Sequence, residues 1–215
     1  MLKESKTEDA ITLNAEMAQF LLAPILLDTA DLAEQVGRAT PKDCAVTEKL
    51  CALAGFRTAE ERTKYFDELQ AEKFDNSGLT MPDLLRKDYK QWGRYGVAAL
   101  CVSLDEALSQ RRGGLAQFLL ELQTFGKKME LDMLLVMFMH FDSEKVFHRE
   151  LAMYSDDVGL HDKFSQFMAV EPELQLEEIT KTDQGKELSF WVQHNVKASR
   201  KQLQPLTDKF FETLN

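Results

Sequence analysis

The stretch LDMLLVMFMHF, residues 131–141, constrains how the rest of this chain can fold. Apolar residues fill nearly every position, so a strand built from it would have to be buried on both faces. The stretch FHRELAMYS (147–155) follows after a short polar gap and suits the second strand of a hairpin. We therefore expect a sheet whose central strand is covered on both sides.

Further strands are predicted before and after this hairpin. The stretch YGVAALCVSL (95–104) fits a strand or a short buried helix, and we favour the strand. The stretches LQLEEIT (174–180) and LSFWVQHN (188–195) are joined by KTDQGKE, whose Asp and Gln-Gly residues favour a turn. These segments extend the sheet beyond the hairpin.

Helical patterns dominate the first ninety residues and recur later. Thr40 followed by Pro41 marks one helix start, Gly55 marks its end, and Thr80 with Asp83 marks another start. The predicted helices are 8–22, 40–55, 58–74, one from Thr80, 103–110, 114–128, and a last one carrying Leu203, Leu206, Phe210, Phe211 and Leu214. The fold class is therefore α+β, a mixed β-sheet flanked by helices and preceded by a mostly helical segment.

The composition narrows the function classes. The 215 residues carry a formal net charge of -10, which argues against general nucleic-acid binding because phosphate backbones attract broad basic faces. No apolar run approaches the roughly 20 residues that span a bilayer, and no secretory signal is visible. Three cysteines without CxxC spacing favour a reducing compartment. We expect a soluble, cytoplasmic protein that binds neither membrane nor nucleic acid.

A small basic cluster near the C-terminus stands out in this acidic chain. The stretch NVKASRKQLQP (195–205) places Lys197, Arg200 and Lys201 within five residues. It could be an ordinary solvated helix start. Alternatively, Ser199 caps a helix and forms a box with Gln202, so that the cations and the helix N-terminus bind an anion. Because Pro205 is poorly tolerated in a helix interior, the helix could also begin only at residue 204 or 205.

A second basic stretch, LLRKDYKQWGR (84–94), contains Arg86, Lys87, Lys90 and Arg94. If this stretch were helical, Arg86, Lys90 and Arg94 would share one face at spacings of four residues. The plain interpretation is a solvated face with two half-buried aromatic rings. Stacking on nucleic-acid bases is the usual alternative, and the acidic balance of the chain speaks against it.

Asp28 is the acidic residue of most interest. It follows the apolar run APILL (23–27), which suits the end of a buried strand, and ligands and metals gather at that edge of an α/β sheet. Its carboxylate could bind Mg²⁺ or Mn²⁺, or simply cap the next turn. Among the histidines, His140 suits a hydrogen-bonded core residue, and His194 is a candidate for a secondary phosphate contact.

Three ordered stretches together resemble a known family. The sequence is similar, from about residue 10 to its end, to the C-terminal part of DHH-superfamily phosphoesterases, nearest to the exopolyphosphatase and Prune group, with family II inorganic pyrophosphatases as relatives. The stretches that carry this resemblance are ILLDTADLAEQVGRATPKD (25–43), KFDNSGLTMPDLLRKDYK (73–90) and NVKASRKQLQP (195–205). The resemblance implies hydrolysis of phosphoanhydride bonds in inorganic polyphosphate or pyrophosphate, with two Mn²⁺ or Mg²⁺ ions held mainly by a DHH domain.

The resemblance also implies roles for individual residues. Asp28 matches a metal ligand, and Lys90, Arg200 and Lys201 match the residues that hold the substrate phosphates. His194, Arg86 and Lys197 are candidates for secondary contacts. Residues 1–36 would be the end of the DHH domain with its linker, and residues 37–215 the DHH-associated C-terminal domain that binds the substrate.

The sequence departs from the family pattern in one respect. Neither a DHH triplet nor a D-x-D motif occurs in it, and Asp28 alone cannot hold two metal ions. We therefore expect weak or no hydrolysis by this chain itself, as if the DHH half had been removed. The alternatives are a Prune-like protein-interaction module without catalysis, and a fragment with no independent function. The apolar run LLAPILL (21–27) would then be exposed and favour self-association.

Overall fold

A computed structural model describes residues 13–109, 112–144, 146–181 and 185–214 of the chain. The chain divides into two compact units, residues 1–75 and residues 76–215. None of the helices in the described ranges combines the length and the apolar character needed to cross a membrane. The division falls after the predicted boundary at residue 36, and the assignment of residues 1–36 to a DHH domain stays a prediction.

The first unit is helical. Its core is a small apolar cluster that includes Leu22, Leu26, Leu50 and Phe66. Capping boxes at Thr40 with Asp43 and at Thr58 with Glu61 begin the second and third α-helices, which confirms the predicted starts. The elements are α1 (Ala15–Thr29), the 3₁₀ turn η1 (Glu34–Val36), α2 (Pro41–Ala54) and α3 (Ala59–Phe74).

The predicted strand that ends at Asp28 is wrong, because α1 runs through Pro24 to Thr29. Leu22 and Leu26 lie one turn apart on the face of α1 that packs against α2 and α3. The burial of this face outweighs the roughly 3 kcal/mol that a proline costs in a helix interior. The run LLAPILL is therefore only partly exposed, with Leu22 and Leu26 buried while Leu21 is exposed.

The second unit is built on a six-stranded sheet with the order β1-β2-β3-β4-β6-β5. The pair β2–β3 is parallel and every other pair is antiparallel, so the sheet is mixed, as predicted. The expected hairpin is the β3–β4 pair, and the predicted C-terminal strands form the β5–β6 pair. The strands are β1 (Tyr89–Trp92), β2 (Tyr95–Leu100), β3 (Met133–Phe141), β4 (Phe147–Tyr154), β5 (Leu176–Ile179) and β6 (Leu188–Gln193).

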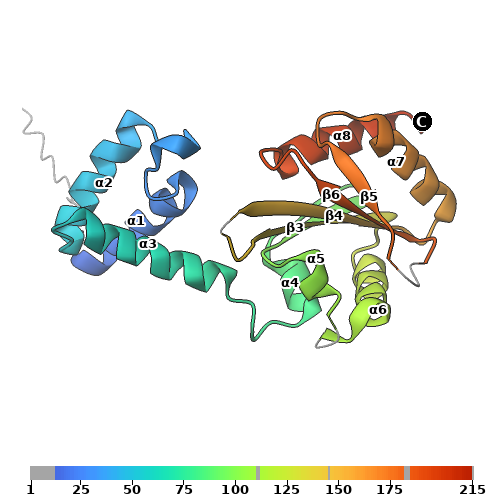
Figure 1. Cartoon of the computed structure of the whole chain (residues 1–215), viewed down its shortest axis with the longest axis horizontal. Coiled ribbons are helices and arrows are strands. Elements are labelled where there is room, and N and C mark those ends of the chain that lie inside the picture. The colour runs from blue at the N-terminus through green and yellow to red at the C-terminus, as the bar shows by residue number, and fades with distance from the viewer. Residues whose placement is uncertain (1–12, 110–111, 145, 182–184, 215) are drawn as a thin grey trace, which may run out of the picture. The chain divides into compact units, whose positions relative to one another are not determined.

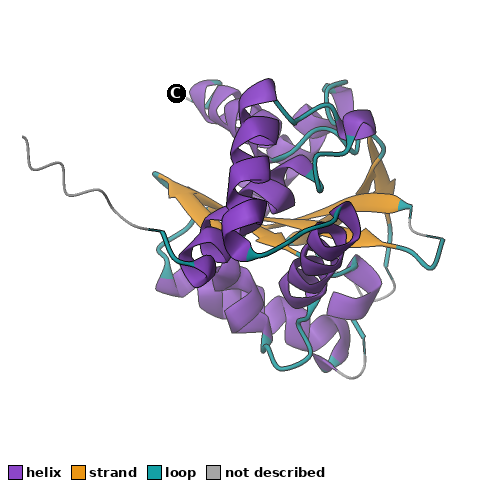
Figure 2. Ribbon diagram, turned by 90° about the vertical axis from the view of Figure 1, so that its left-hand side faces the viewer, coloured by secondary structure: helices purple, strands orange, loops and turns teal. Residues whose placement is uncertain are grey.

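Helices cover both faces of this sheet, as Figures 1 and 2 show. Side chains of β3 alternate between the two resulting cores: Val136 and Phe138 pack with α4, α5 and α6, whereas Leu135 and Met137 pack with α7 and α8. This confirms that the central strand is buried on both faces. The helices are α4 (Met81–Lys87), α5 (Leu104–Ala107), α6 (Gly114–Lys128), α7 (Val158–Val170) and α8 (Arg200–Glu212).

Two elements of this unit differ from the sequence-based expectation. The helix α4 ends at Lys87 and the edge strand β1 follows at once, so Arg86, Lys90 and Arg94 do not share a helical face. Pairing of β1 with β2 supplies the hydrogen bonds that a longer helix would have provided. The helix α7 was not predicted, although Asp157 caps it by accepting hydrogen bonds from the backbone of Gly159 and Leu160.

Replacing Gly96 by alanine is expected to destabilise the second unit. A Cβ at this position would lie 2.5 Å from the Tyr89 hydroxyl, and the Tyr89 ring is held edge-on against Phe125. Overpacking of this kind costs about 1–3 kcal/mol, more than the roughly 0.5–1 kcal/mol that alanine gains over glycine in a strand. Urea unfolding followed by tryptophan fluorescence measures the change, because both tryptophans, Trp92 and Trp191, lie in this unit.

The matched control is Gly78→Ala, since a Cβ there meets no atom within 4 Å. Its unfolding free energy should stay within about 0.5 kcal/mol of the wild-type value. Equal midpoints for the two variants would contradict the close approach of Tyr89 to Gly96.

Candidate functional site

The N-terminus of α8 opens onto a cavity of about 260 Å³ at one end of the sheet. Three of the predicted phosphate-binding residues, Lys90, Arg200 and Lys201, meet there although more than a hundred residues separate Lys90 from the other two. The remaining lining residues are Asp88, Trp92, Ala99, Met137, Met139, Arg149, Ser199 and Gln204. We call this cavity the α8 pocket.

The helix α8 begins as the alternative with a capped helix predicted for the basic stretch 195–205. Ser199 is the N-cap, its hydroxyl accepts a hydrogen bond from the backbone N–H of Lys201, and Gln202 completes the capping box. The later start at residue 204 or 205 is wrong: Pro205 lies inside the helix. The buried side chains of Leu203 and Phe210 hold the helix against the sheet and offset the cost of the proline.

Arg200 joins the start of α8 to the start of β1. Its guanidinium donates to the backbone carbonyl of Asp88 at 3.0 Å and to the Asp88 Oδ1 at 2.7 Å. The Arg200 side chain is only 18% exposed, so this contact is partly shielded from water. Asp88 lies two residues before Lys90, so the ion pair holds both predicted phosphate-binding segments at the same pocket.

The positive charges of Lys90 and Lys201 differ from that of Arg200, which is paired with the Asp88 carboxylate. Lys90 lies on β1 opposite Val97, and Lys201 lies in the first turn of α8. Within the described ranges, neither ammonium group forms an ion pair. The positive end of the dipole of the 13-residue helix α8 adds to these charges. An arrangement of this kind favours an anion over a cation.

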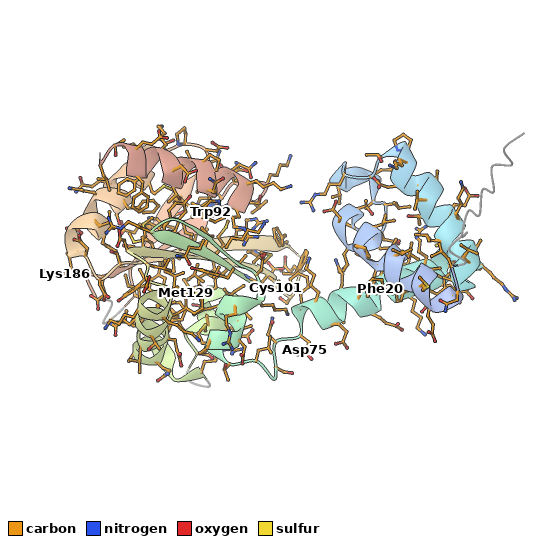
Figure 3. The ribbon with its side chains drawn as sticks, turned by 180° about the vertical axis from the view of Figure 1, so that it is seen from behind. Phe20, Asp75, Trp92, Cys101, Met129 and Lys186 are labelled. Atoms are coloured by element: carbon orange, nitrogen blue, oxygen red, sulfur yellow. The ribbon has the colours of Figure 1, made fainter. Side chains whose placement is uncertain are left out.

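The floor of the α8 pocket is apolar. Met137 and Met139 come from β3 and Trp92 from the end of β1, and all three belong to the core on the side of the sheet covered by α7 and α8. Figure 3 labels Trp92. Trp92 stacks on Tyr95, and the Tyr95 hydroxyl donates to Asp208 at 2.5 Å. Burial and this hydrogen bond raise the pKa of Tyr95. Apolar surroundings lower the local dielectric and strengthen the attraction between the cations and a bound anion.

Arg149 is a fourth cation of the pocket that was not predicted from the sequence. Its Nε donates to the carbonyl of Val196 at 2.8 Å, and its guanidinium lies 5.1 Å from the centre of the Phe147 ring. The alternation in FHRELAMYS could have revealed it, because Arg149 shares a strand face with the core residues Leu151 and Met153. A charged residue at the end of an apolar strand face is a signal of function or of a specific partner.

The balance of charge distinguishes this pocket from three larger cavities in the same unit. Four cations against the single carboxylate of Asp88 give its lining a net formal charge of +3. A cavity of about 560 Å³ sets Arg94 and Lys163 against three aspartates, and one of about 310 Å³ sets Arg112 against Glu121. A third, of about 480 Å³, has Lys163 as its one charged lining residue, so the α8 pocket has the most positive lining of these four cavities.

The other predicted site residues lie outside the α8 pocket. Arg86 pairs with Asp83 at 2.6 Å, the His194 Nε2 lies 2.7 Å from the Glu177 carboxylate, and Lys197 is exposed without lining the cavity. Their roles as secondary contacts stay predictions.

Asp28 lies in the first unit, exposed in the last turn of α1 and not at the mouth of a strand. The described residues contain no group of three or more His, Cys, Asp or Glu side chains that could hold a metal ion. The implied pair of Mn²⁺ or Mg²⁺ ions therefore does not fit the ligands found in the described part of this chain.

Comparison with known proteins matches the DHHA2 domain to residues 67–210. The chain is 34% identical over 200 residues to exopolyphosphatase PRUNE1 of Homo sapiens, covering 90% of this chain and 42% of that protein. It is 33% identical over 212 residues to exopolyphosphatase PRUNE1 of Bos taurus, covering 94% of this chain and 45% of that protein. The chain thus spans less than half the length of these relatives.

The energy of the ion pair between Arg200 and Asp88 can be measured by a double-mutant cycle with Arg200→Gln and Asp88→Asn. We expect a coupling of about 1 kcal/mol in the free energy of unfolding, because Arg200 is mostly shielded while the half-exposed Asp88 is screened by water. Urea titration of the four proteins gives the value. A coupling within error of zero would show that the two segments are held together without this ion pair.

Proposed function

The chain belongs to the exopolyphosphatase and Prune branch of the DHH superfamily and carries its DHHA2 domain, and from this premise we propose that the α8 pocket binds inorganic polyphosphate or pyrophosphate for hydrolysis. The observation that carries the proposal is the +3 lining of the pocket in a chain of net charge -10. A polyanionic substrate needs a local positive site of this kind, not a basic protein.

The pocket residues have distinct parts in the proposed chemistry. Lys90 and Lys201 bind the non-bridging oxygens of the phosphoryl groups and neutralise the charge that a nucleophile would otherwise meet. Arg200, oriented by Asp88, presents a planar guanidinium that suits a phosphoryl group better than a lysine would. The apolar floor excludes water from one side of the substrate. This chain therefore contributes substrate binding and charge stabilisation to the reaction.

A second candidate function, association with a protein or with another copy of this chain, is favoured by one observation. Met17, Phe20 and Leu21 follow one another at helical spacing on α1, and all three are exposed, Phe20 to 78%. An exposed, contiguous apolar patch on a soluble protein often marks a surface that binds a partner. It leaves the proposal for the α8 pocket unchanged, because the two features lie in separate units.

Calorimetric titration with tripolyphosphate tests the proposed function. The variant Lys90→Gln/Lys201→Gln removes two charge-assisted contacts, so its affinity should fall by about tenfold to several hundredfold. The matched control, Lys127→Gln/Lys128→Gln, removes the same charge from the exposed last turn of α6, outside the pocket, and should change the affinity by less than about threefold. Equal losses in both variants would show that the ligand is attracted by positive charge in general and not by the pocket. The absence of binding to the wild-type chain would overturn the proposal.

Sedimentation velocity over a range of protein concentrations tests the second candidate. If the face of α1 mediates self-association, Phe20→Glu should shift the protein toward monomer, because a carboxylate in an apolar contact is not solvated. Leu120→Glu is the control, since Leu120 is an exposed apolar residue on α6. Identical sedimentation of the two variants and the wild-type protein would contradict the role of α1.

A further inference from the structure

Ser199 lies at the N-terminus of α8 and lines the α8 pocket together with Arg200 and Lys201. Among the lining residues of this pocket, all of which belong to the described ranges, it is the one that carries a hydroxyl group. The hydroxyl accepts a hydrogen bond from the backbone N–H of Lys201 at 3.3 Å and donates one to the Gln202 Oε1 at 3.1 Å. The Ser199 Oγ therefore lies at the same helix end as the proposed phosphate-binding groups.

The surroundings of Ser199 would stabilise a phosphoryl group attached to its side chain. The backbone N–H groups in the first turn of a helix point toward the cap, and the positive end of the helix dipole favours a dianion there. Arg200 and Lys201 follow directly in the sequence, and Lys90 reaches the same pocket from β1. A phosphate ester at a helix N-terminus forms charge-assisted hydrogen bonds with such groups. The groups proposed to bind the substrate are thus also suited to a phosphoserine of the chain itself.

The segment that precedes Ser199 is accessible. His194, Val196 and Lys197 are exposed, and Ser199 is half-buried with an extended backbone (φ -118°, ψ -170°). Opening of this loop and of the first turn of α8 exposes the hydroxyl without unfolding the sheet. Basic residues stand two positions before the serine and one and two positions after it, and protein kinases select their substrates by such charge patterns.

We propose that Ser199 is a phosphorylation site and that its phosphoserine closes the α8 pocket to the substrate. This inference rests on the proposed function and adds a means of regulation to the same pocket. A protein kinase forms the bond between the Ser199 Oγ and the γ-phosphorus of ATP while the bond from that phosphorus to the oxygen of ADP breaks, and the hydroxyl proton passes to a base of the kinase. The ester adds a charge of about -1.5 to -2, which lowers the formal charge of the lining from +3 to about +1.

Proteins with a phosphoserine placed at position 199, or at position 143 as a control, test this effect. Ser143 is exposed in the turn between β3 and β4 and does not line the pocket, so the control carries the same added charge elsewhere. In calorimetry with tripolyphosphate, the protein phosphorylated at Ser199 should bind at least about tenfold more weakly than the control, because the phosphoserine occupies the cations of the pocket. Equal affinities would overturn the inference while the proposed function stands.

A second readout, ³¹P NMR over a range of pH, does not need the substrate. Cations around a phosphate favour its dianion, so the second pKa of the phosphoserine at position 199 should lie below that of the phosphoserine at position 143. Equal pKa values would contradict a contact with the cations of the pocket. If the unmodified chain binds no tripolyphosphate, the proposed function fails, and a lowered pKa would still support this contact.

Ser199→Asp is the variant to use if the phosphorylated protein does not fold. Aspartate also caps helices and adds a single negative charge, so the affinity for tripolyphosphate should fall by about threefold to tenfold. Mass spectrometry of the chain isolated from the cells that make it, with phosphatases inhibited, tests whether the modification occurs. Phosphate on Ser199 would support the inference, and its absence would overturn the regulatory role.

Discussion

Burial of β3 on both faces is the constraint on which the rest of the second unit depends. Its side chains alternate between two cores, so the strand is stable only if helices cover the sheet on either side. On one side α8 provides this cover through Leu203 and Phe210. The same packing brings the N-terminus of α8 to the end of the sheet where β1 lies, and the α8 pocket results from that placement.

The pocket concentrates positive charge within an acidic chain. The pairing of Arg200 with Asp88 joins two segments that are 112 residues apart in sequence, and it orients one guanidinium while leaving the ammonium groups of Lys90 and Lys201 to bind an anion. The local field, not the net charge, then selects the ligand. Binding of a condensed phosphate is consistent with this field and with the family to which the chain belongs.

Features that depend on neighbouring residues were predictable, and features that depend on distant packing were not. The capping boxes at Thr40 and Ser199 each involve two side chains three residues apart, so the local sequence predicts them. The burial of β3 on both faces is likewise predicted by the apolar residues of that strand alone. The helical state of the run before Asp28 depends on packing against α2 and α3. The meeting of Lys90 with Arg200 was implied by the family resemblance alone. The alternation along β4 shows Arg149 as a charge on an apolar face, but its place in the pocket depends on the packing of α8 on the sheet.

Binding of a condensed phosphate at the N-terminus of α8 can be observed residue by residue. The most direct measurement is a titration of ¹⁵N-labelled protein with tripolyphosphate, followed by amide and arginine Nε–H correlation spectra. We expect the largest shifts at the backbone amides of residues 199–201 and of Lys90, and at the Arg149 Nε–H. Largest shifts at the cavity lined by Arg94 and Lys163, or no shifts at millimolar ligand, would contradict it.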